Sequence, residues 1–334
     1  MKIINLSNFE TSWNWLRDEF SHPGQWRHVT TDTSRMPKGL PLRNQLAGFS
    51  TAISAVALAR MAGRAILVSH GPRPAFYAGM VARLLQPDLP HLACSFNFTN
   101  LPTGKNRVLM AASYRQVRKF LTYSTVERTL YAEYFGIPLE KIDMLHWAVH
   151  PPAIDPASTP IESGDYICAL GSQARDYGTL FAAIEKLPHI KLVVVANLES
   201  IHDLHFPSNV KVHMDIPRER ALNILQHSRF MVLPLRDSRV PCGHVTIVSA
   251  MFFGKAIIVT DSTGVHDYIQ DRHNGLFYDS RDVAALRLKV DMLWNDSAQA
   301  AVLASAARAF AYLHCTHVSA VNYFKSFTAA VQAG

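Results

Sequence analysis

The sequence predicts an α/β protein built from two Rossmann-like domains, each a doubly wound parallel sheet. Short apolar runs of strand length alternate with helical apolar patterns along the chain. The alternation stops once, at the Pro- and Ser-rich residues 151–164, and then restarts. The chain has 334 residues, enough for two ordinary domains. Its 49% hydrophobic and 18% charged residues exclude a disordered or fibrous protein.

The first domain is expected over residues 1–150. Its apolar runs predict strands at residues 2–6, 27–31, 64–69, 91–96 and 142–148. Helical patterns lie at residues 45–61, 74–85, 107–123 and 126–135. The last helix is followed by Gly136 and Pro138, a helix-stop signal.

Residues 151–164 lack an apolar period and predict an interdomain linker. In the second domain, residues 165–313, strands are expected at 166–170, 191–196, 210–213, 230–233 and 256–260. Helices are expected at 179–187, 218–226, 245–253, 283–294 and 298–312, and a last one at 317–331. In such folds ligands bind at the carboxyl ends of the strands.

Charge is distributed unevenly between the two halves. Residues 1–150 hold 17 Lys and Arg against 9 Asp and Glu, and the remainder holds 16 against 17. This favours an anionic partner for the first domain, such as a phosphorylated substrate or an anionic membrane surface, or else only a solvated basic face. No nucleic-acid-binding motif occurs, so we expect no nucleic-acid partner.

The other global features predict a soluble, cytoplasmic protein without a metal site. The four cysteines are scattered without a CxxC pair, and the histidines form no zinc motif. The first residues lack the apolar core of a secretory signal, and no uncharged stretch is long enough to span a membrane.

The segment 233–279 is the richest in potential chemistry. After a predicted strand, Gly243 allows a ligand to approach the backbone closely. The first N–H groups of the next helix, at His244, Val245 and Thr246, offer an anion site with an added hydroxyl. A second turn, from Asp261 to Gly264, follows the next strand at the same sheet edge. The two turns together suit a diphosphate, or they are two ordinary helix-capping loops.

Residues 249–279 resemble the donor-binding segment of nucleotide-sugar glycosyltransferases with the GT-B fold. The resemblance is strongest to family 4, the glycosyl transferases group 1. The matching motifs are Ser249-Ala250-Met251, Gly254-Lys255-Ala256, Thr260-Asp261 with Gly264, and Asn274-Gly275-Leu276. Residues 170–180 (LGSQARDYGTL) resemble the family's first turn against the donor diphosphate, which implies donor contacts from Gly171 and Ser172.

The resemblance implies a GT-B architecture, with two Rossmann-like domains facing a central cleft. Residues 1–150 would then bind the acceptor and residues 165–313 the nucleotide-sugar donor. Residues 314–334 would form a C-terminal helix that packs on the first domain.

Several positions depart from the family pattern. The two family glutamates, eight positions apart, fall at Pro241 and Ser249, and the family lysine falls at Tyr177. Asp237 would replace the first glutamate if the loop is reshaped. Arg175 is the nearest cation for the diphosphate, or it is a solvated surface arginine.

Three sets of residues in the first domain are candidates for acceptor or membrane contacts. His70 follows a predicted strand and would bind the acceptor or take its proton, or is a structural loop histidine. Asn97 and Asn100 follow another strand and would line the same cleft. The predicted helix 107–123 places Arg115, Arg118 and Lys119 on one face, which suits anionic lipid headgroups or is only a solvated basic face.

The expected function is transfer of a sugar from a nucleoside-diphosphate-sugar donor to a glycan or lipid-linked acceptor. Fixed donor groups would replace a metal, so no cofactor is expected. The family resemblance implies retention of the anomeric configuration, and weak contact with an anionic membrane would place the protein on its inner face. The alternative is a catalytically silent GT-B binding or scaffold protein, which the Pro241 and Ser249 replacements favour.

Overall fold

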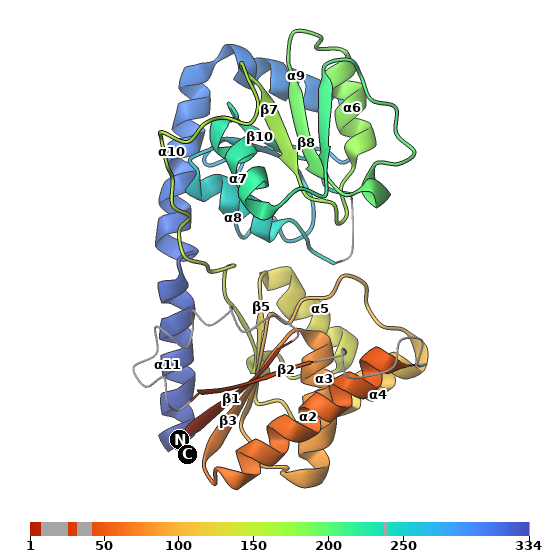
Figure 1. Ribbon diagram of the computed structural model, residues 1–334, viewed down its shortest axis with the longest axis vertical. Helices are drawn as coiled ribbons and strands as arrows, with labels where there is room; N and C mark the ends of the chain where they lie inside the picture. Colours follow the sequence, from red (N-terminus) through yellow and green to blue (C-terminus); the bar gives the residue numbers. More distant parts are fainter. Residues whose placement is uncertain (8–25, 32–41, 237–239, 334) are drawn as a thin grey trace. The chain divides into compact units, whose positions relative to one another are not determined.

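The protein consists of two compact α/β units, which confirms the predicted pair of Rossmann-like domains (Figure 1). The computed structural model describes residues 1–7, 26–31, 42–236 and 240–333. The first unit comprises Met1–Leu145 and His317–Gly334, and the second comprises His146–Thr316. The C-terminal helix is therefore part of the first unit.

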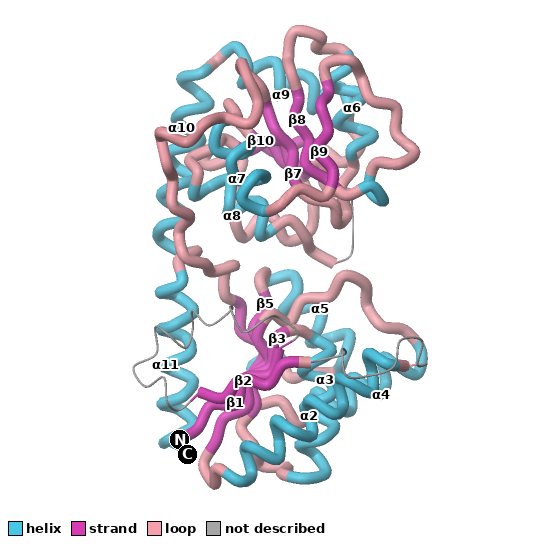
Figure 2. The backbone as a smooth tube through the Cα atoms, in the orientation of Figure 1, coloured by secondary structure: helices cyan, strands magenta, loops and turns pink. Residues whose placement is uncertain are grey.

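The first unit is built on a six-stranded sheet in the order β2-β1-β3-β4-β5-β6, in which every neighbouring pair is parallel. Figure 2 shows β1, β2, β3 and β5 of this sheet beside α2, α3 and α11. Its strands are β1 (Lys2–Ser7), β2 (Trp26–Thr30), β3 (Ala65–His70), β4 (His91–Cys94), β5 (Lys119–Thr122) and β6 (Ile142–Met144). Its helices are α2 (Arg43–Met61), α3 (Pro72–Leu85), α4 (Gly104–Tyr114), α5 (Thr125–Phe135), the short η2 (Leu139–Lys141) and α11 (His317–Ala333).

Strand alternation divides the core of the first unit into two layers. Ile4 and Leu67 belong to a cluster with buried residues of α2 and α3. Ile3 and Val68, one position away on the same strands, pack instead with Phe324 of α11. Because successive side chains of a strand point to opposite faces, the sheet is covered by helices on both sides.

The second unit has a parallel six-stranded sheet in the order β12-β11-β10-β7-β8-β9. Its strands are β7 (Ile167–Leu170), β8 (Leu192–Ala196), β9 (Val210–Met214), β10 (Met231–Leu233), β11 (Ile257–Thr260) and β12 (Leu276–Tyr278). Its helices are α6 (Tyr177–Glu185), η3 (Leu198–Ser200), α7 (Arg218–His227), α8 (His244–Phe252), α9 (Val283–Asn295) and α10 (Ser297–His314).

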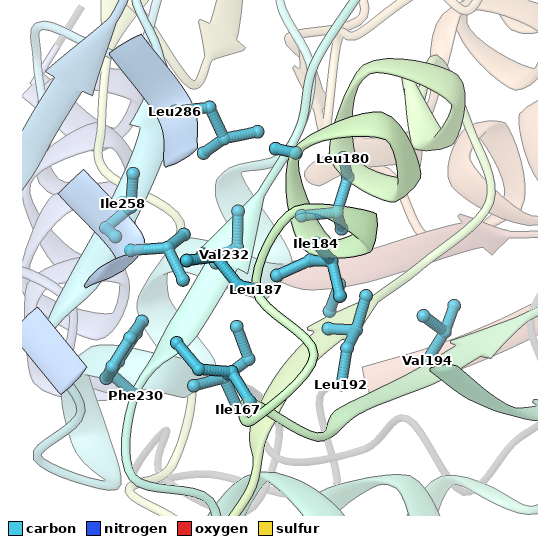
Figure 3. Close-up of a cluster of buried hydrophobic side chains, with 14 of the residues drawn as sticks. Ile167, Leu180, Ile184, Leu187, Leu192, Val194, Phe230, Val232, Ile258 and Leu286 are labelled. Atoms are coloured by element: carbon cyan, nitrogen blue, oxygen red, sulfur yellow. The ribbon is translucent and has the colours of Figure 1, made fainter. Parts of the chain in front are cut away.

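The core of the second unit is also two-layered. On one face, strand residues such as Val194 and Val232 pack against Leu180 and Ile184 of α6 and Leu286 of α9 (Figure 3). On the other face, strand residues pack against α7, α8 and α10. These near-continuous apolar strands are typical of parallel sheets that are buried on both sides.

One predicted element is wrong. The helix expected over residues 107–123 ends at Tyr114, and its second half is the strand β5. Phe120 is buried beside Tyr114 in the aromatic core, and an extended backbone there lets β5 pair with β4 and β6. Arg115, Arg118 and Lys119 therefore share no helical face, and Lys119 Nζ pairs with Asp143 at 3.0 Å.

The expected linker is part of the second unit. Residues 155–163, which we call the strap, run along α7, and Glu162 of the strap is only 3% exposed. Hydrogen bonds from the Asn223 and Gln226 side chains of α7 hold its backbone. The Pro- and Ser-rich strap forms no helix or strand of its own, but it is held by contacts with α7.

Candidate functional site

A pocket of about 290 Å³ opens at the carboxyl end of the second sheet. It lies between the segments that follow β7, β8 and β9 and the helices α7 and α8. Its lining residues are Leu170, Gly171, Ser172, Val195, Ala196, Asn197, Asp215, Ile216, Arg218, Ala221, Leu222, Leu225, Val245, Thr246 and Ser249. The sequence predicted five of them as donor contacts: Gly171, Ser172, Val245, Thr246 and Ser249.

The turn after β7 depends on a glycine. Gly171 has φ +103°, and a Cβ there would lie 2.6 Å from Nη2 of Arg175. The Tyr177 hydroxyl donates to the Gly171 carbonyl. Ser172 Oγ accepts a 2.8 Å hydrogen bond from the Asn197 backbone N–H, which joins this turn to the end of β8. Tyr177 is buried, so it supports the turn and does not line the pocket.

Arg175 is not a solvated surface arginine. Its side chain is 5% exposed and donates from Nε to the Leu170 carbonyl at 3.2 Å and from Nη1 to the Gln173 carbonyl at 2.7 Å. Nη2 donates to Thr246 Oγ1 at 3.1 Å. Burial lowers the pKa of Arg175 from its usual value, but guanidinium stays charged in proteins. Within the described ranges no carboxylate forms an ion pair with it, so a buried positive charge lies directly behind the pocket wall.

The start of α8 adds a second source of positive potential. Gly243 is the N-cap residue, with φ +93°, and a Cβ there would contact the Leu233 side chain at 3.2 Å. The first N–H groups of a helix attract anions, and here the Thr246 N–H donates to the Gly243 carbonyl at 3.0 Å, so the attraction comes from the helix start as a whole. Val245 and Thr246, in the first turn, line the pocket. The buried guanidinium and the helix start therefore favour a negatively charged ligand at the same wall.

The second predicted turn and His244 do not line the pocket. His244 is 4% exposed, its ring stacks on Tyr268, and Nε2 lies 3.4 Å from the Gly264 carbonyl oxygen. Burial lowers the pKa of His244 to about 4, so it is neutral at pH 7. Asp261 pairs with the exposed His266 at 2.7 Å. His244 thus joins the start of α8 to the turn before Tyr268 and has a structural role.

The positions of the two family glutamates carry no charge here. Ser249 lines the pocket, but its hydroxyl donates to the Val245 carbonyl of its own helix at 2.8 Å. Pro241 is buried. The suggested replacement, Asp237, lies outside the described residues.

Sequence reasoning missed one side of the pocket. Asn197 follows β8, and Asp215 and Ile216 follow β9, while Arg218 begins α7. These residues stand directly after strands, at the sheet edge where ligands bind in parallel α/β folds. Their position was therefore a usable signal, although none belongs to a motif.

The candidate acceptor residues of the first unit are embedded in polar networks. His70, the last residue of β3, has Nε2 2.9 Å from Asn5 Oδ1, and Asn5 Nδ2 lies 3.1 Å from His28 Nδ1. Burial, followed by the nearby His28, lowers the pKa of His70 to about 4. The network crosses β3, β1 and β2 and holds a neutral imidazole at the carboxyl end of β3.

Asn97 also has a structural partner. Its amide donates to Oε1 of Glu127, a fully buried carboxylate at the start of α5. Glu127 also accepts from the Tyr131 hydroxyl and the Tyr123 N–H, and its own N–H bonds the capping Ser124. Asn97 thus fastens the loop after β4 to α5. Asn100 is exposed at the tip of that loop.

Two negative findings concern the described parts of the chain only. None of the helices there is long and apolar enough to cross a bilayer. No cluster of three or more His, Cys, Asp or Glu suited to a metal ion occurs there either.

Comparisons with known proteins agree with this architecture. Residues 178–310 match the family model described as glycosyl transferases group 1. A curated relative is the N,N'-diacetylbacillosaminyl-diphospho-undecaprenol alpha-1,3-N-acetylgalactosaminyltransferase of Campylobacter jejuni, 26% identical over 133 residues. The match spans 40% of this chain but only 35% of that protein, so it covers about a third of the relative.

Solved structures of the same fold match nearly the whole chain. Sucrose-phosphate synthase from Thermosynechococcus elongatus has a TM-score of 0.75 at 14% identity, with both chains fully covered. Anabaena HepE in complex with UDP and glucose has a TM-score of 0.75 at 14% identity, with 99% of each chain covered. A glycosyltransferase from Rickettsia africae gives 0.73 at 15% identity and covers 100% of this chain and 91% of its own. Residues 178–310 of the second unit therefore match the group 1 glycosyltransferases, and the two Rossmann-like units share the GT-B fold of these solved structures.

Proposed function

We propose that the chain binds a nucleoside-diphosphate sugar in the pocket of the second unit and transfers the sugar to a glycan or lipid-linked acceptor. One observation carries the proposal. The buried guanidinium of Arg175 bonds Thr246 at the start of α8, so a fixed positive charge and a helix N-terminus meet at one wall of the pocket. This arrangement suits a diphosphate.

The rest of the pocket suits a nucleoside. Val195, Ile216 and Leu222 provide apolar surface for a base and ribose, and Asn197 and Asp215 provide polar groups at its rim. Anabaena HepE, a neighbour in fold, was solved in complex with UDP and with UDP-glucose. That neighbour supports a nucleotide in this chain's pocket without specifying the base.

In the proposed reaction, the bond between the sugar C1 and the diphosphate oxygen breaks, and a bond between C1 and an acceptor hydroxyl oxygen forms. Negative charge grows on the departing diphosphate. The charge of Arg175 and the N–H groups at the start of α8 are placed to stabilise that charge, a role that a metal ion plays in other enzymes. We therefore propose that the reaction needs no metal.

We propose retention at C1, as in the group 1 family, with the acceptor proton passing to the departing diphosphate. Inversion would instead require a base in the first unit. His70 is neutral at pH 7 and ends a strand, which makes it the candidate for that alternative.

The acceptor side is proposed to contact an anionic membrane through the start of α4. Residues 103–109 are all exposed, including Val108 at 68% and Leu109 at 48%, and they follow the loop that contains Asn97 and Asn100. Lys105 adds a positive charge on the same turns. A helix start with exposed apolar and basic side chains suits the surface of an anionic bilayer that holds a lipid-linked acceptor.

Calorimetric titration of the full chain with UDP and GDP in EDTA tests the donor proposal. We expect heat of binding with at least one of them. No heat with any common nucleoside diphosphate would contradict the proposal. Binding without transfer to any acceptor would indicate a silent binding protein, the alternative that the uncharged Ser249 favours.

A further inference from the structure

One side of the pocket is built from weakly buried parts of the second unit, namely the helix α7 and the loop that follows the edge strand β9. The helix α7 has ten residues and fully buries only Ile224 and Leu225. The edge strand β9 has no fully buried side chain, whereas all four residues of β7 are buried. Apolar burial, which fixes most elements of a fold, therefore contributes little here. Yet α7 and the loop that follows β9 line the pocket.

The strap, residues 155–163, is hydrogen-bonded to α7. The Asn223 side chain accepts from the Ile161 N–H at 3.0 Å and donates to the Thr159 carbonyl at 3.1 Å. One turn later, Gln226 Nε2 donates to the Asp155 carbonyl at 2.6 Å. Asn223 thus bonds the strap backbone as a neighbouring strand would, and it lies one residue from the pocket-lining Leu222.

The same strap is tied to the two strands at the edge of the sheet. Glu162 Oε1 lies 2.7 Å from Lys211 Nζ and 2.8 Å from His213 Nε2, both on β9. Glu162 Oε2 lies 2.7 Å from Lys191 Nζ, just before β8. Burial alone would raise the pKa of Glu162, but these three hydrogen bonds hold it at about 2. His213 is paired in register with Val195, which lines the pocket.

We propose that the strap is a brace for the ligand pocket, and that Glu162 and Asn223 are positioning residues that hold β9 and α7 in the binding geometry. The proposal rests on nucleotide binding at this pocket. Without the brace, α7 and the loop after β9 would leave that geometry part of the time. A pocket that is competent for one tenth of the time binds its ligand about ten-fold more weakly.

The first test is calorimetry of the full chain with UDP and GDP for Glu162→Gln and Asn223→Ala. We expect an affinity about ten-fold lower in each variant, with Glu162→Asp intermediate because it keeps the charge. Two controls separate positioning from general damage. Glu185→Gln removes an exposed carboxylate at the end of α6, on the other face of the sheet. Val290→Ala opens the buried core beneath α9 and lowers Tm.

Both controls should bind nucleotide within about two-fold of the wild type. If Val290→Ala loses as much affinity as Glu162→Gln at a similar Tm, the brace is overturned, because general destabilisation then explains the loss. Affinity that is unchanged in both strap variants also overturns it.

Amide hydrogen exchange of the nucleotide-free chain supplies a readout that needs no ligand. In both strap variants, amides of residues 210–227 should exchange faster than in the wild type, while those of β7 and β10 should not. Unchanged amide exchange in residues 210–227 would overturn the proposal that the strap is a brace. If the wild type bound no nucleotide but the exchange pattern held, the brace would stand and the proposed function would fail.

Discussion

Nη2 of Arg175 donates a 3.1 Å hydrogen bond to the hydroxyl oxygen of Thr246, and so joins the turn after β7 to the first turn of α8. The two residues stand 71 positions apart in the sequence. The contact aligns a buried cation with a helix N-terminus at the carboxyl edge of the sheet.

Replacing Arg175 should weaken nucleoside-diphosphate binding, more when both its charge and its donor groups are removed than when only the donor groups are. We expect Arg175→Ala to cost about 1.5–3 kcal/mol of binding free energy, because it removes the charge behind the pocket wall and the charged donor that holds the Thr246 hydroxyl. Arg175→Lys keeps the charge but loses the fork of donors, and should fall between Ala and wild type. Calorimetry measures the effect. Arg229→Ala, which removes a guanidinium stacked on Trp294, should bind normally. Equal affinity for Arg175→Ala and wild type would remove Arg175 from the site.

Gly171→Ala should disturb the pocket more than another Gly→Ala change in the same unit. Both Gly171 and Gly254 have positive φ, so each alanine carries a backbone cost of about 1 kcal/mol or more. A Cβ at Gly254 meets only Arg308 Cδ at an ordinary 3.6 Å, whereas a Cβ at Gly171 would lie 2.6 Å from Arg175. Denaturant unfolding and UDP titration should therefore show a larger loss of stability and of affinity for Gly171→Ala. Matching losses in the two variants would show that the Arg175 contact does not matter.

The free energy of unfolding should fall as the pH drops from 6.5 to 4. Burial lowers the pKa of His91 to about 3 and of His244 to about 4. Unfolded histidine takes up a proton below about pH 6.5, so the unfolded state binds more protons throughout this interval. Each group can therefore contribute up to about 3 kcal/mol of lost stability by pH 4.

His244→Phe should flatten this dependence, because phenylalanine can still stack on Tyr268 but binds no proton. Urea unfolding at a series of pH values measures it. His205→Phe, at an exposed position, serves as the control and should leave the pH profile unchanged. A profile for His244→Phe that is parallel to the wild type would show that the pKa of His244 is the same in the folded and unfolded states.

Membrane association should depend on α4 rather than on the residues around β5. A Lys105→Ala, Val108→Ser and Leu109→Ser variant should lose co-sedimentation with anionic liposomes, because each basic group contributes about 1 kcal/mol and each inserted apolar side chain roughly 1–2 kcal/mol. Added salt should weaken the remaining binding. The double variant Arg115→Ala and Arg118→Ala should sediment like the wild type. The opposite ranking of the two variants would assign the membrane contact to the residues between α4 and β5.

The two sheets and several site residues could be predicted from the sequence, because the patterns that specify them are local. Alternating apolar runs predicted both sheets, because a strand buried on two faces must be apolar throughout. Gly171 and Gly243 marked the turns where the backbone takes positive φ. Thr246 was predicted at the site because the first turn of its helix follows a strand at the carboxyl edge of the sheet, and Ser172 because residues 170–180 resemble the family's first turn.

Other features were decided only by tertiary structure. Residues 107–123 carry one apolar pattern that suits a helix, but pairing with β4 and β6 makes the second half a strand. The sequence leaves Arg175 as either the nearest cation for a diphosphate or a solvated surface arginine, and the turn after β7 excludes the second by burying it against Thr246. The composition of the strap predicts a linker, but in the structure Glu162 of the strap is buried and pairs with Lys211 and His213 of β9. In each case the outcome depends on partners distant in the chain, and burial or charge pairing with such partners outweighs the local preference.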